Sequence, residues 1–318
     1  MKIHIVSTIN GEENEGMRNI ATHLGREFEK THTVIYSALR DLFGIIRRSY
    51  SCDVTFVIAR AVGKVYRICQ VAQIFAERLC VVLVQKPEDE FVRRCKARPL
   101  CCDYFALVRA DAEELPIHLG CRVFDLSLGI DAKKFSPVDQ VRASQLKEKY
   151  GFDAKPVILH VGHLSSGRGL EDFLLLNSTK YNLLVVTSGM FEDKQIEKML
   201  ISHGVRLIKG YLSAVNELYQ LADVYLFPTK STDFVIDISL SVMEALSCGT
   251  AVIAYRSLET LQRAGLADGG GLLFAENADD IPALAKQAVA MKSEKSYLTN
   301  PKTWAQVADD VLRAVAKE

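Results

Sequence analysis

Short, mostly apolar runs alternate with amphipathic segments along the whole chain, and this alternation limits the possible folds more than any other feature. Residues 2–7, 54–59 and 80–84 are such runs, which is typical of strands that are buried on both faces. Residues 16–30 instead repeat apolar side chains with a helical period. Strands that alternate with helices predict a parallel sheet covered by helices on both faces. We therefore expect an α/β fold.

The alternation occurs twice, which predicts two domains. The chain has 318 residues, enough for two ordinary domains, and a second series of strands begins at residues 157–161. We place one Rossmann-like domain at residues 1–150 and a second at residues 151–318, with a C-terminal helix at 304–315 that could cross back to the first domain. Two doubly wound domains that face one another enclose a central cleft at the carboxyl ends of their sheets, where such folds bind ligands.

The composition favours a soluble cytoplasmic protein. The first residues mix charged and apolar side chains too early for a secretory signal, and no apolar run approaches the length of a membrane span. The eight cysteines show no regular spacing, which favours free thiols in a reducing compartment. Cys95, Cys101 and Cys102 lie close together in the sequence, but they form no C-x2-C pair and have no neighbouring histidine, so we expect no metal site.

The charge is distributed unevenly although the formal net charge is zero. Residues 1–150 hold 23 Lys and Arg against 19 Asp and Glu, and residues 47–98 hold 11 against 5. Nucleic-acid binding needs a stronger imbalance with interleaved aromatic residues, so we expect no nucleic-acid partner. The basic, partly apolar residues 42–48 and 91–98 suggest peripheral contact with an anionic membrane on its inner face, which salt should weaken in a vesicle-binding assay. The alternative is a merely solvated face.

Residues 233–254 (DFVIDISLSVMEALSCGTAVIA) predict a polar loop, a helix from about Ser239, and a buried strand. Ser239, Leu240 and Ser241 would stand at the start of that helix, where unpaired N–H groups and the positive end of the dipole favour a phosphate. Glu244 is the only carboxylate on the helix, and it could accept hydrogen bonds from sugar hydroxyls one turn further along. The pairing suggests a nucleotide diphosphate, although a helical Glu is more often only a helix former.

Residues 162–169 (GHLSSGRG) form a second motif, between a predicted strand and a predicted helix. The spacing is similar to a Walker A loop, but Arg168 replaces its Lys and Gly169 replaces its metal-binding hydroxyl residue, which excludes a P-loop NTPase. A Gly167–Arg168 turn at a helix start could still cradle a diphosphate; the alternative is a surface turn with a solvated Arg. We expect His160 in the core and His163 facing the loop. No motif of a hydrolase or a dehydrogenase is present.

These motifs resemble, in their order, those of family-4 retaining glycosyltransferases with the GT-B fold, of the "glycosyl transferases group 1" type. The segments that carry the resemblance are LSLGIDAKKFSP, VILHVGHLSSGRGLEDFL, GYLSAVNELYQLADVYLFPT, VMEALSCGTAVIAY and GGGLLFAENADDIPALAKQA. The second half of the chain is covered well and the first half weakly. The resemblance implies transfer of a hexosyl group from a nucleotide-diphosphate sugar, most often UDP- or GDP-linked, to a glycan, lipid-linked or small-molecule acceptor. It also implies retention of configuration and no metal or other cofactor.

The resemblance assigns roles to several residues of the second half. Arg168 stands where the family has a Lys that binds the donor diphosphate, and His163 stands where it usually has an Arg, so that contact could depend on pH. Glu244 matches the second Glu of the family's E-x7-E motif, which binds the ribose hydroxyls. Ser239 replaces a Gly whose backbone meets the phosphate, and its N–H remains usable. Further donor contacts are expected from strand-end loops and the glycine loop of the first half: Gly16, Ser188, Gly189 and Tyr211.

The largest departure from the family pattern is Ile236, which occupies the position of the first Glu of E-x7-E. That carboxylate normally serves the transferred sugar. Asp233 and Asp237 flank the position, and either could substitute after a small shift of the loop. The family's polar residue after the fourth strand, commonly His, falls near Gln85 or Lys86 here, and neither has the pKa of a general base.

Three functions therefore remain open. The first is sugar transfer, with catalysis by Arg168 and by Asp233 or Asp237. The second is a non-catalytic nucleotide-sugar-binding protein or partner subunit of a glycosyltransferase, which Ile236 motivates. The third is another reaction on the same fold, such as sugar-nucleotide epimerisation.

Overall fold

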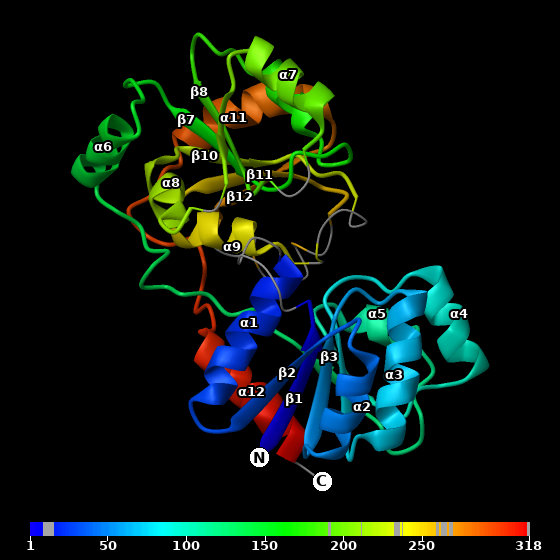
Figure 1. Ribbon diagram of the computed structural model, residues 1–318. Helices are drawn as coiled ribbons and strands as arrows, with labels where there is room; N and C mark the ends of the chain where they lie inside the picture. Colours follow the sequence, from blue (N-terminus) through cyan, green and yellow to red (C-terminus); the bar gives the residue numbers. More distant parts are fainter. Residues whose placement is uncertain are drawn as a thin grey trace. The chain divides into compact units, whose positions relative to one another are not determined.

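The chain forms two α/β units, which consist of Met1–Gly129 with Lys302–Glu318 and of Ile130–Pro301. Figure 1 shows the elements of both in a computed structural model. The structure describes residues 1–8, 16–189, 192–210, 212–231, 236, 238–258, 261, 266 and 270–316.

The first unit is built on one parallel sheet of six strands. Their order is β2 (Thr33–Ala38), β1 (Lys2–Ser7), β3 (Val54–Ile58), β4 (Leu79–Leu83), β5 (Asp103–Ala106) and β6 (Val123–Asp125). Its helices are α1 (Gly16–Glu29), α2 (Leu42–Tyr50), α3 (Gly63–Phe75), α4 (Asp89–Ala97), α5 (Arg109–Glu113) and α12 (Trp304–Ala316). Every residue of β3 and β4 is buried, as expected of a strand covered on both faces.

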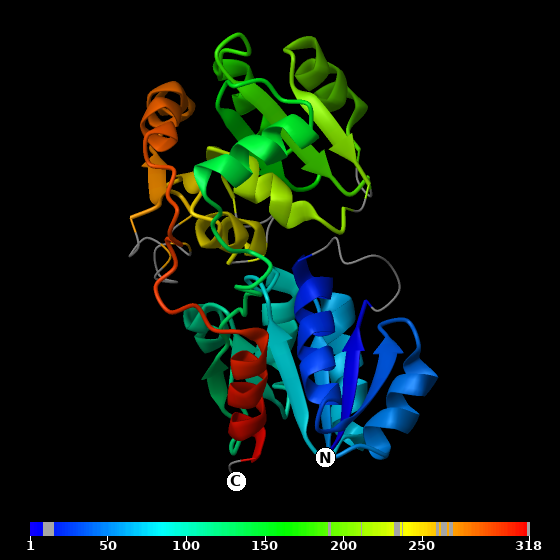
Figure 2. The same cartoon turned by 90° about the vertical axis from the view of Figure 1, so that its left-hand side faces the viewer.

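Aromatic side chains fill one side of this sheet. Phe28 of α1 stacks on Phe56 of β3, which contacts Phe105 of β5, and Phe105 stacks on Phe124 of β6. The C-terminal helix α12 lies beside α1 (Figures 1 and 2). The ring of Trp304 at its start stacks on His23 of α1, with 4.7 Å between ring centroids. The last helix therefore completes the core of the first unit.

The second unit has a parallel six-stranded sheet of its own. Its order is β12 (Leu272–Ala275), β11 (Ala251–Tyr255), β10 (Val224–Phe227), β7 (Val157–Val161), β8 (Asn182–Thr187) and β9 (Arg206–Lys209). The helices are α6 (Gln140–Lys149), η1 (Leu170–Leu175), α7 (Lys194–Ser202), α8 (Val215–Leu221), α9 (Leu240–Ser247), η3 (Ala278–Asp280) and α11 (Ile281–Val289). The expected fold class, two Rossmann-like doubly wound units, is confirmed.

The strand order of the second unit creates a switch point between β7 and β10. β7 is the first strand of the unit and β10 the fourth, yet they are neighbours in the sheet. β8 and β9 extend the sheet on one side of β7, whereas β10, β11 and β12 extend it on the other. The loops that leave β7 and β10 therefore diverge, and ligands of doubly wound sheets bind in the crevice at this point, beyond the carboxyl ends of the strands.

The division between the units differs from the predicted one at residue 150. Residues 130–150 belong to the second unit, because α6 packs against α8 and its Lys147 pairs with Asp223 at 2.7 Å. Tyr150 donates a hydrogen bond of 2.7 Å to Glu217 of α8. The chain thus enters the second unit at Ile130, and α12 lies with the first unit.

The cysteines and the helices can be compared with the predictions of free thiols and of no membrane span. All eight cysteines are free thiols, and none of the helices that the structure describes is long and apolar enough to cross a membrane.

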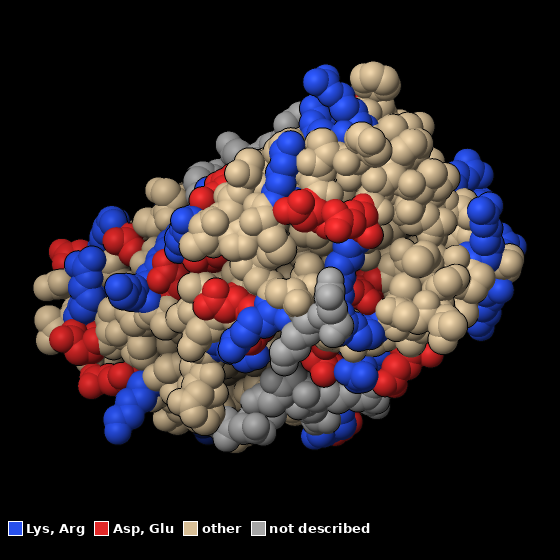
Figure 3. Space-filling model, turned by 90° about the horizontal axis from the view of Figure 1, so that it is seen from below, with Lys and Arg blue, Asp and Glu red and all other residues tan. Residues whose placement is uncertain are grey.

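Phe91 of α4 is fully buried, so part of the predicted membrane-contact surface is core, whereas Phe43 of α2 is 77% exposed. Contact with an anionic membrane stays a prediction. Basic and acidic side chains are interspersed on the face seen in Figure 3, unlike the basic stripe typical of nucleic-acid binding.

Candidate functional site

A glycine turn follows β7 at the switch point. Gly167 and Gly169 have φ angles of 86° and 68°, in the left-handed region that glycine adopts without strain. A Cβ atom on Gly169 would lie 2.1 Å from the carbonyl oxygen of Pro228, just after β10. The predicted helix after the turn is the 3₁₀ helix η1, and its Leu170 and Phe173 are buried. Gly169 thus lets the loop after β7 close against the end of β10.

Replacing Gly169 by Ala should destabilise the second unit. The left-handed conformation alone costs about 1 kcal/mol for a residue with a Cβ, and the collision with the Pro228 carbonyl should add at least about 1–2 kcal/mol. Gly270→Ala is a matched control, because Gly270 has a φ of 77° and open space around a built Cβ. Urea unfolding should show a clearly larger loss for Gly169→Ala. Equal losses of unfolding free energy in the two variants would show that the collision of a Cβ atom at residue 169 with the Pro228 carbonyl does not destabilise the protein.

Arg168 stands between the two glycines with its side chain half-buried. Among the residues that the structure describes, its guanidinium has no ion pair and no side-chain hydrogen bond; its backbone N–H donates to the Ser165 carbonyl at 3.3 Å. Burial lowers the pKa of Arg168 from its ordinary value. A desolvated cation without a counter-charge is costly, so the position is well suited to an anionic ligand.

The two histidines of the motif differ in environment. His160 on β7 is fully buried, its Nδ1 lies 3.0 Å from the Leu226 carbonyl oxygen, and burial lowers its pKa to about 3. It is a core residue, as predicted. His163 is half-buried, and burial together with the charge of Arg168 lowers its pKa to about 4. His163 is therefore neutral at pH 7 and could offer an N–H, but not a charge, to a diphosphate.

The first turn of α9 has no side-chain cap from its N-cap residue. Ser239 is the N-cap residue, but its side chain makes no capping bond to the helix backbone. Its hydroxyl lies 2.8 Å from that of Ser241 instead. The N–H groups at Leu240 and Ser241 therefore keep their capacity to bind an anion, and the helix dipole supports it.

Glu244 lies one turn further along α9. Burial raises its pKa to about 7, although the Tyr219 hydroxyl and the charge of Lys134 act in the opposite direction. A carboxyl group that loses its proton near neutral pH in a protected place is a candidate ligand-binding group. The role of Glu244 toward a ligand stays a prediction.

Tyr225 of β10 connects these groups, and no motif in the sequence pointed to it. Its hydroxyl donates a hydrogen bond of 3.1 Å to the carbonyl of Val161 at the end of β7. Burial raises its pKa, which also responds to a hydrogen bond with Ser241 and to the charges of Glu244 and Arg168. The turn after β7 and the start of α9 therefore meet around one hydroxyl. A single tyrosine hydroxyl within an otherwise apolar strand was the available signal.

The other predicted site residues of the second half either lie outside the described residues or are located only by the element that they follow. Asp233, Asp237 and Tyr211 lie outside the described residues. Ile236, in the position of the family's first Glu, is half-buried. Ser188 and Gly189 follow β8, the neighbour of β7, so they belong to the same carboxyl edge, and Gly189 has a φ of 79°.

The predicted residues of the first half all lie in the first unit. Gly16 is the first residue of α1. Gln85 is buried just after β4, and the ammonium of Lys86 lies 3.9 Å from Glu114. Their roles toward the donor stay predictions.

The site lies within the part of the chain that matches a known family. Residues 155–294 match the family model described as Glycosyl transferases group 1. The Anabaena protein HepE, solved in complex with UDP-glucose, is 12% identical, with a TM-score of 0.79 and both chains fully covered. A glycosyltransferase from Rickettsia africae is 13% identical, with a TM-score of 0.71 over 99% of each chain.

One curated relative is more similar in sequence. The sulfoquinovosyl transferase SQD2 of Arabidopsis thaliana is 26% identical over 134 residues, which cover 41% of this chain and 25% of the relative. The chain therefore spans about a quarter of that protein's length. The structural likeness gives the class by fold: the chain has the GT-B fold. Residues 155–294, within its second unit, are similar to the glycosyl transferases group 1 family.

Proposed function

We propose that the chain transfers a sugar from a nucleotide-diphosphate sugar to an acceptor. The observation that carries the proposal is that the Arg168 guanidinium, which has no ion pair among the described residues, and the first turn of α9, which Ser239 does not cap, both interact with Tyr225 at the switch point. Both favour a diphosphate. Glu244 then stands one helical turn away, where it can accept hydrogen bonds from the ribose hydroxyls.

Catalysis would depend on charge stabilisation. Negative charge grows on the diphosphate as its bond to the sugar breaks, and groups already aimed at it lower the barrier without reorganising. Arg168 and the amides at Leu240 and Ser241 would supply that stabilisation, with a hydrogen bond from neutral His163. We assign the hydroxyls of the transferred sugar to Asp233 or Asp237.

The finer features of the reaction are part of the proposal. A UDP-linked hexose is supported by the complex of HepE with UDP-glucose and by the naming of SQD2 as a sulfoquinovosyl transferase. We further propose retention of configuration, transfer without a metal ion at this site, and a glycan, lipid-linked or small-molecule acceptor. The site's anion-binding groups are a guanidinium and backbone amides, which can neutralise a diphosphate without a cation.

A non-catalytic nucleotide-sugar-binding protein is the second candidate. Ile236 favours it, because an apolar side chain occupies the position where the family places a carboxylate for the transferred sugar. A protein of this kind would keep the diphosphate and ribose contacts and lose transfer. A shared fold does not by itself establish turnover.

A donor screen tests the proposal. Thermal unfolding of the full chain would be measured with UDP-, GDP-, ADP- and dTDP-linked sugars; we expect one nucleotide class to raise the melting temperature through preferential binding to the native state. Mass spectrometry with that donor and candidate acceptors should then show sugar transfer, and NMR its configuration. Binding without transfer would favour the non-catalytic protein, a new sugar nucleotide formed without acceptor would indicate an epimerase, and no binding of any donor would contradict all three.

A further inference from the structure

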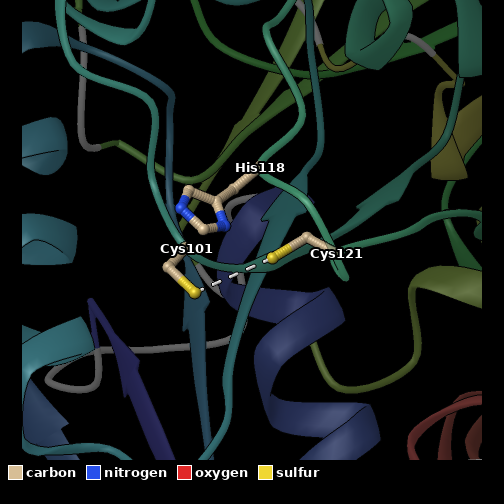
Figure 4. A group of neighbouring side chains, drawn as sticks. All are labelled: Cys101, His118 and Cys121. Carbon is tan, nitrogen blue, oxygen red and sulfur yellow. Dashed lines mark hydrogen bonds between the residues drawn. The ribbon is translucent and has the colours of Figure 1, made fainter.

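Three potential metal ligands lie together in the first unit, far in the sequence from the switch point of the second. They are Cys101, His118 and Cys121, and each contributes a ligand atom within 4.8 Å of the others. Figure 4 shows the histidine ring beside the two thiols. The two Sγ atoms are 3.9 Å apart. Cys101 and His118 are exposed and Cys121 is half-buried, so an ion could reach all three.

The register of the sheet brings these residues together. β5 and β6 are parallel neighbours, with Tyr104 opposite Val123. Cys101 and Cys121 each stand two residues before their strand begins, so both thiols lie at the amino edge of the sheet. His118 is added by a turn in which the N–H of Cys121 donates to the His118 carbonyl at 2.9 Å. The cluster is therefore a product of strand pairing and one turn.

We propose that Cys101, His118 and Cys121 bind a zinc ion. Thiolate sulfur and imidazole nitrogen are the ligands that zinc prefers, and tetrahedral zinc with bonds of about 2.3 Å holds two sulfurs about 3.8 Å apart. The observed 3.9 Å agrees with that separation. A disulfide would need an S–S distance of about 2.05 Å. The two sulfurs are thus spaced for a shared cation.

The histidine has a second contact that suits it for this role. Its Nδ1 lies 3.0 Å from the carbonyl oxygen of Leu119, which can only accept, so the proton of the neutral ring is on Nδ1. The lone pair of this tautomer is then on Nε2. Metal-binding histidines usually make such a hydrogen bond to a carbonyl or carboxylate with their other ring nitrogen.

The fourth position of the zinc ion would be open. The nearby carboxylate of Asp103 is already engaged by Arg78 at 3.0 Å and by the N–H of Arg122 at 2.8 Å. Cys101 and Cys121 border a cavity of about 400 Å³, which Arg78 and Arg122 also line. A water molecule or a small anion would therefore complete the coordination, and binding would release the protons of the two thiols to solvent.

The position of the cluster separates it from the proposed transfer reaction. It lies at the amino edge of its sheet, whereas doubly wound sheets bind substrates at the carboxyl edge. Zinc would connect the segments that precede β5 and β6, and it would fix the conformation of the turn at residues 116–122. The ion would therefore stabilise the first unit, whether or not the second unit transfers sugar.

Metal titration of the untagged full chain tests the proposal. The protein would be reduced with a phosphine, stripped of metal, and titrated with zinc against a chromogenic chelator and, separately, with cobalt. We expect one equivalent of zinc, and intense thiolate-to-cobalt absorption. Cys101→Ser, His118→Ala and Cys121→Ser should each weaken zinc binding at least about tenfold. Leu119→Ala, a change of a fully exposed side chain in the same turn, should not.

The same titration can overturn the proposal in three ways. The reduced chain could give no thiolate-to-cobalt absorption. The double variant Cys101→Ser with Cys121→Ser could bind zinc as tightly as the wild type. Peptide mapping could find Cys101 and Cys121 joined in a disulfide under the reducing conditions used. As a second readout, zinc should raise the melting temperature of the wild type and leave that of the double variant unchanged.

Discussion

Arg168→Ala is expected to lower the turnover of sugar transfer by about 10²–10³-fold, the usual cost of removing one donor that stabilises charge in the transition state. The Arg168 guanidinium stands in the turn after β7. Its charge acts on the pKa of Tyr225, and so do the charge of Glu244 and a hydrogen bond with Ser241. Arg168→Lys should lose about tenfold, because an ammonium keeps the charge but not the planar pair of N–H donors. Turnover at saturating donor is the measurement.

Arg256→Ala is the matched control for this prediction. Arg256 directly follows β11 at the carboxyl edge of the same sheet, but its guanidinium pairs with Glu276. Its loss should leave turnover unchanged. Urea unfolding gives a second check: the described part of the chain offers Arg168 no ion pair, so Arg168→Ala should keep or increase the free energy of unfolding. Turnover of Arg168→Ala within about twofold of wild type would remove this residue from the reaction.

Glu244→Gln is expected to weaken donor binding at pH 8 by about 10–100-fold. A hydrogen bond to a charged group contributes about 1.5–3 kcal/mol, and the amide keeps the size of the carboxylate while losing its charge. Calorimetric titration with the nucleotide sugar found in the screen measures the change. Glu171→Gln, which alters an exposed carboxylate on η1 of the same unit, should bind as the wild type does.

The pH dependence of Glu244 gives an independent test. Burial raises its pKa to about 7 from an ordinary 4.5, so the native state holds this proton more tightly than the unfolded chain does. The free energy of unfolding should therefore fall as the pH rises from about 4.5 to about 7. Glu244→Gln removes this penalty and should be the more stable protein at pH 8, but not at pH 4.

Donor binding should change with pH in the opposite sense. Since the ionised carboxylate is the better acceptor, wild-type affinity should increase up to about tenfold from pH 6 to pH 8, and that of Glu244→Gln should stay flat. His163 adds no change in that window because its pKa lies near 4. An affinity for the wild type that is as flat as that of the variant would separate Glu244 from the ribose.

Local patterns predicted individual elements well where the chain is buried on both sides. β1 and β7 were predicted with their bounds, because covered strands leave mostly apolar runs. The predicted domain boundary at residue 150 differs from the division between residues 129 and 130. The charged residues 140–149 show no strong apolar face, and only the contacts of α6 with α8 assign them to the second unit.

The candidate site shows the same contrast. The order of the motifs singled out Arg168 and Glu244 from the sequence, yet the motifs are separated by more than 70 residues and carry no distances. Tyr225 was missed, because a residue within an apolar strand is assigned to the core by default. His118 and Cys121 were missed for a related reason: they lie 17 and 20 residues beyond Cys101, and only strand pairing makes them neighbours.

The sequence by itself determined the α/β fold class and the two successive units, and it singled out the residues that we propose for a nucleotide diphosphate, because these inferences depend on periodicity and on local order along the chain. The tertiary structure decided the burial, the pKa values and the spatial neighbours of those residues. Burial leaves Arg168 desolvated and raises the pKa of Glu244, and the pairing of β7 with β10 places the carboxyl ends of these two strands side by side. These properties depend on which distant segments pack against one another, and no local pattern encodes that.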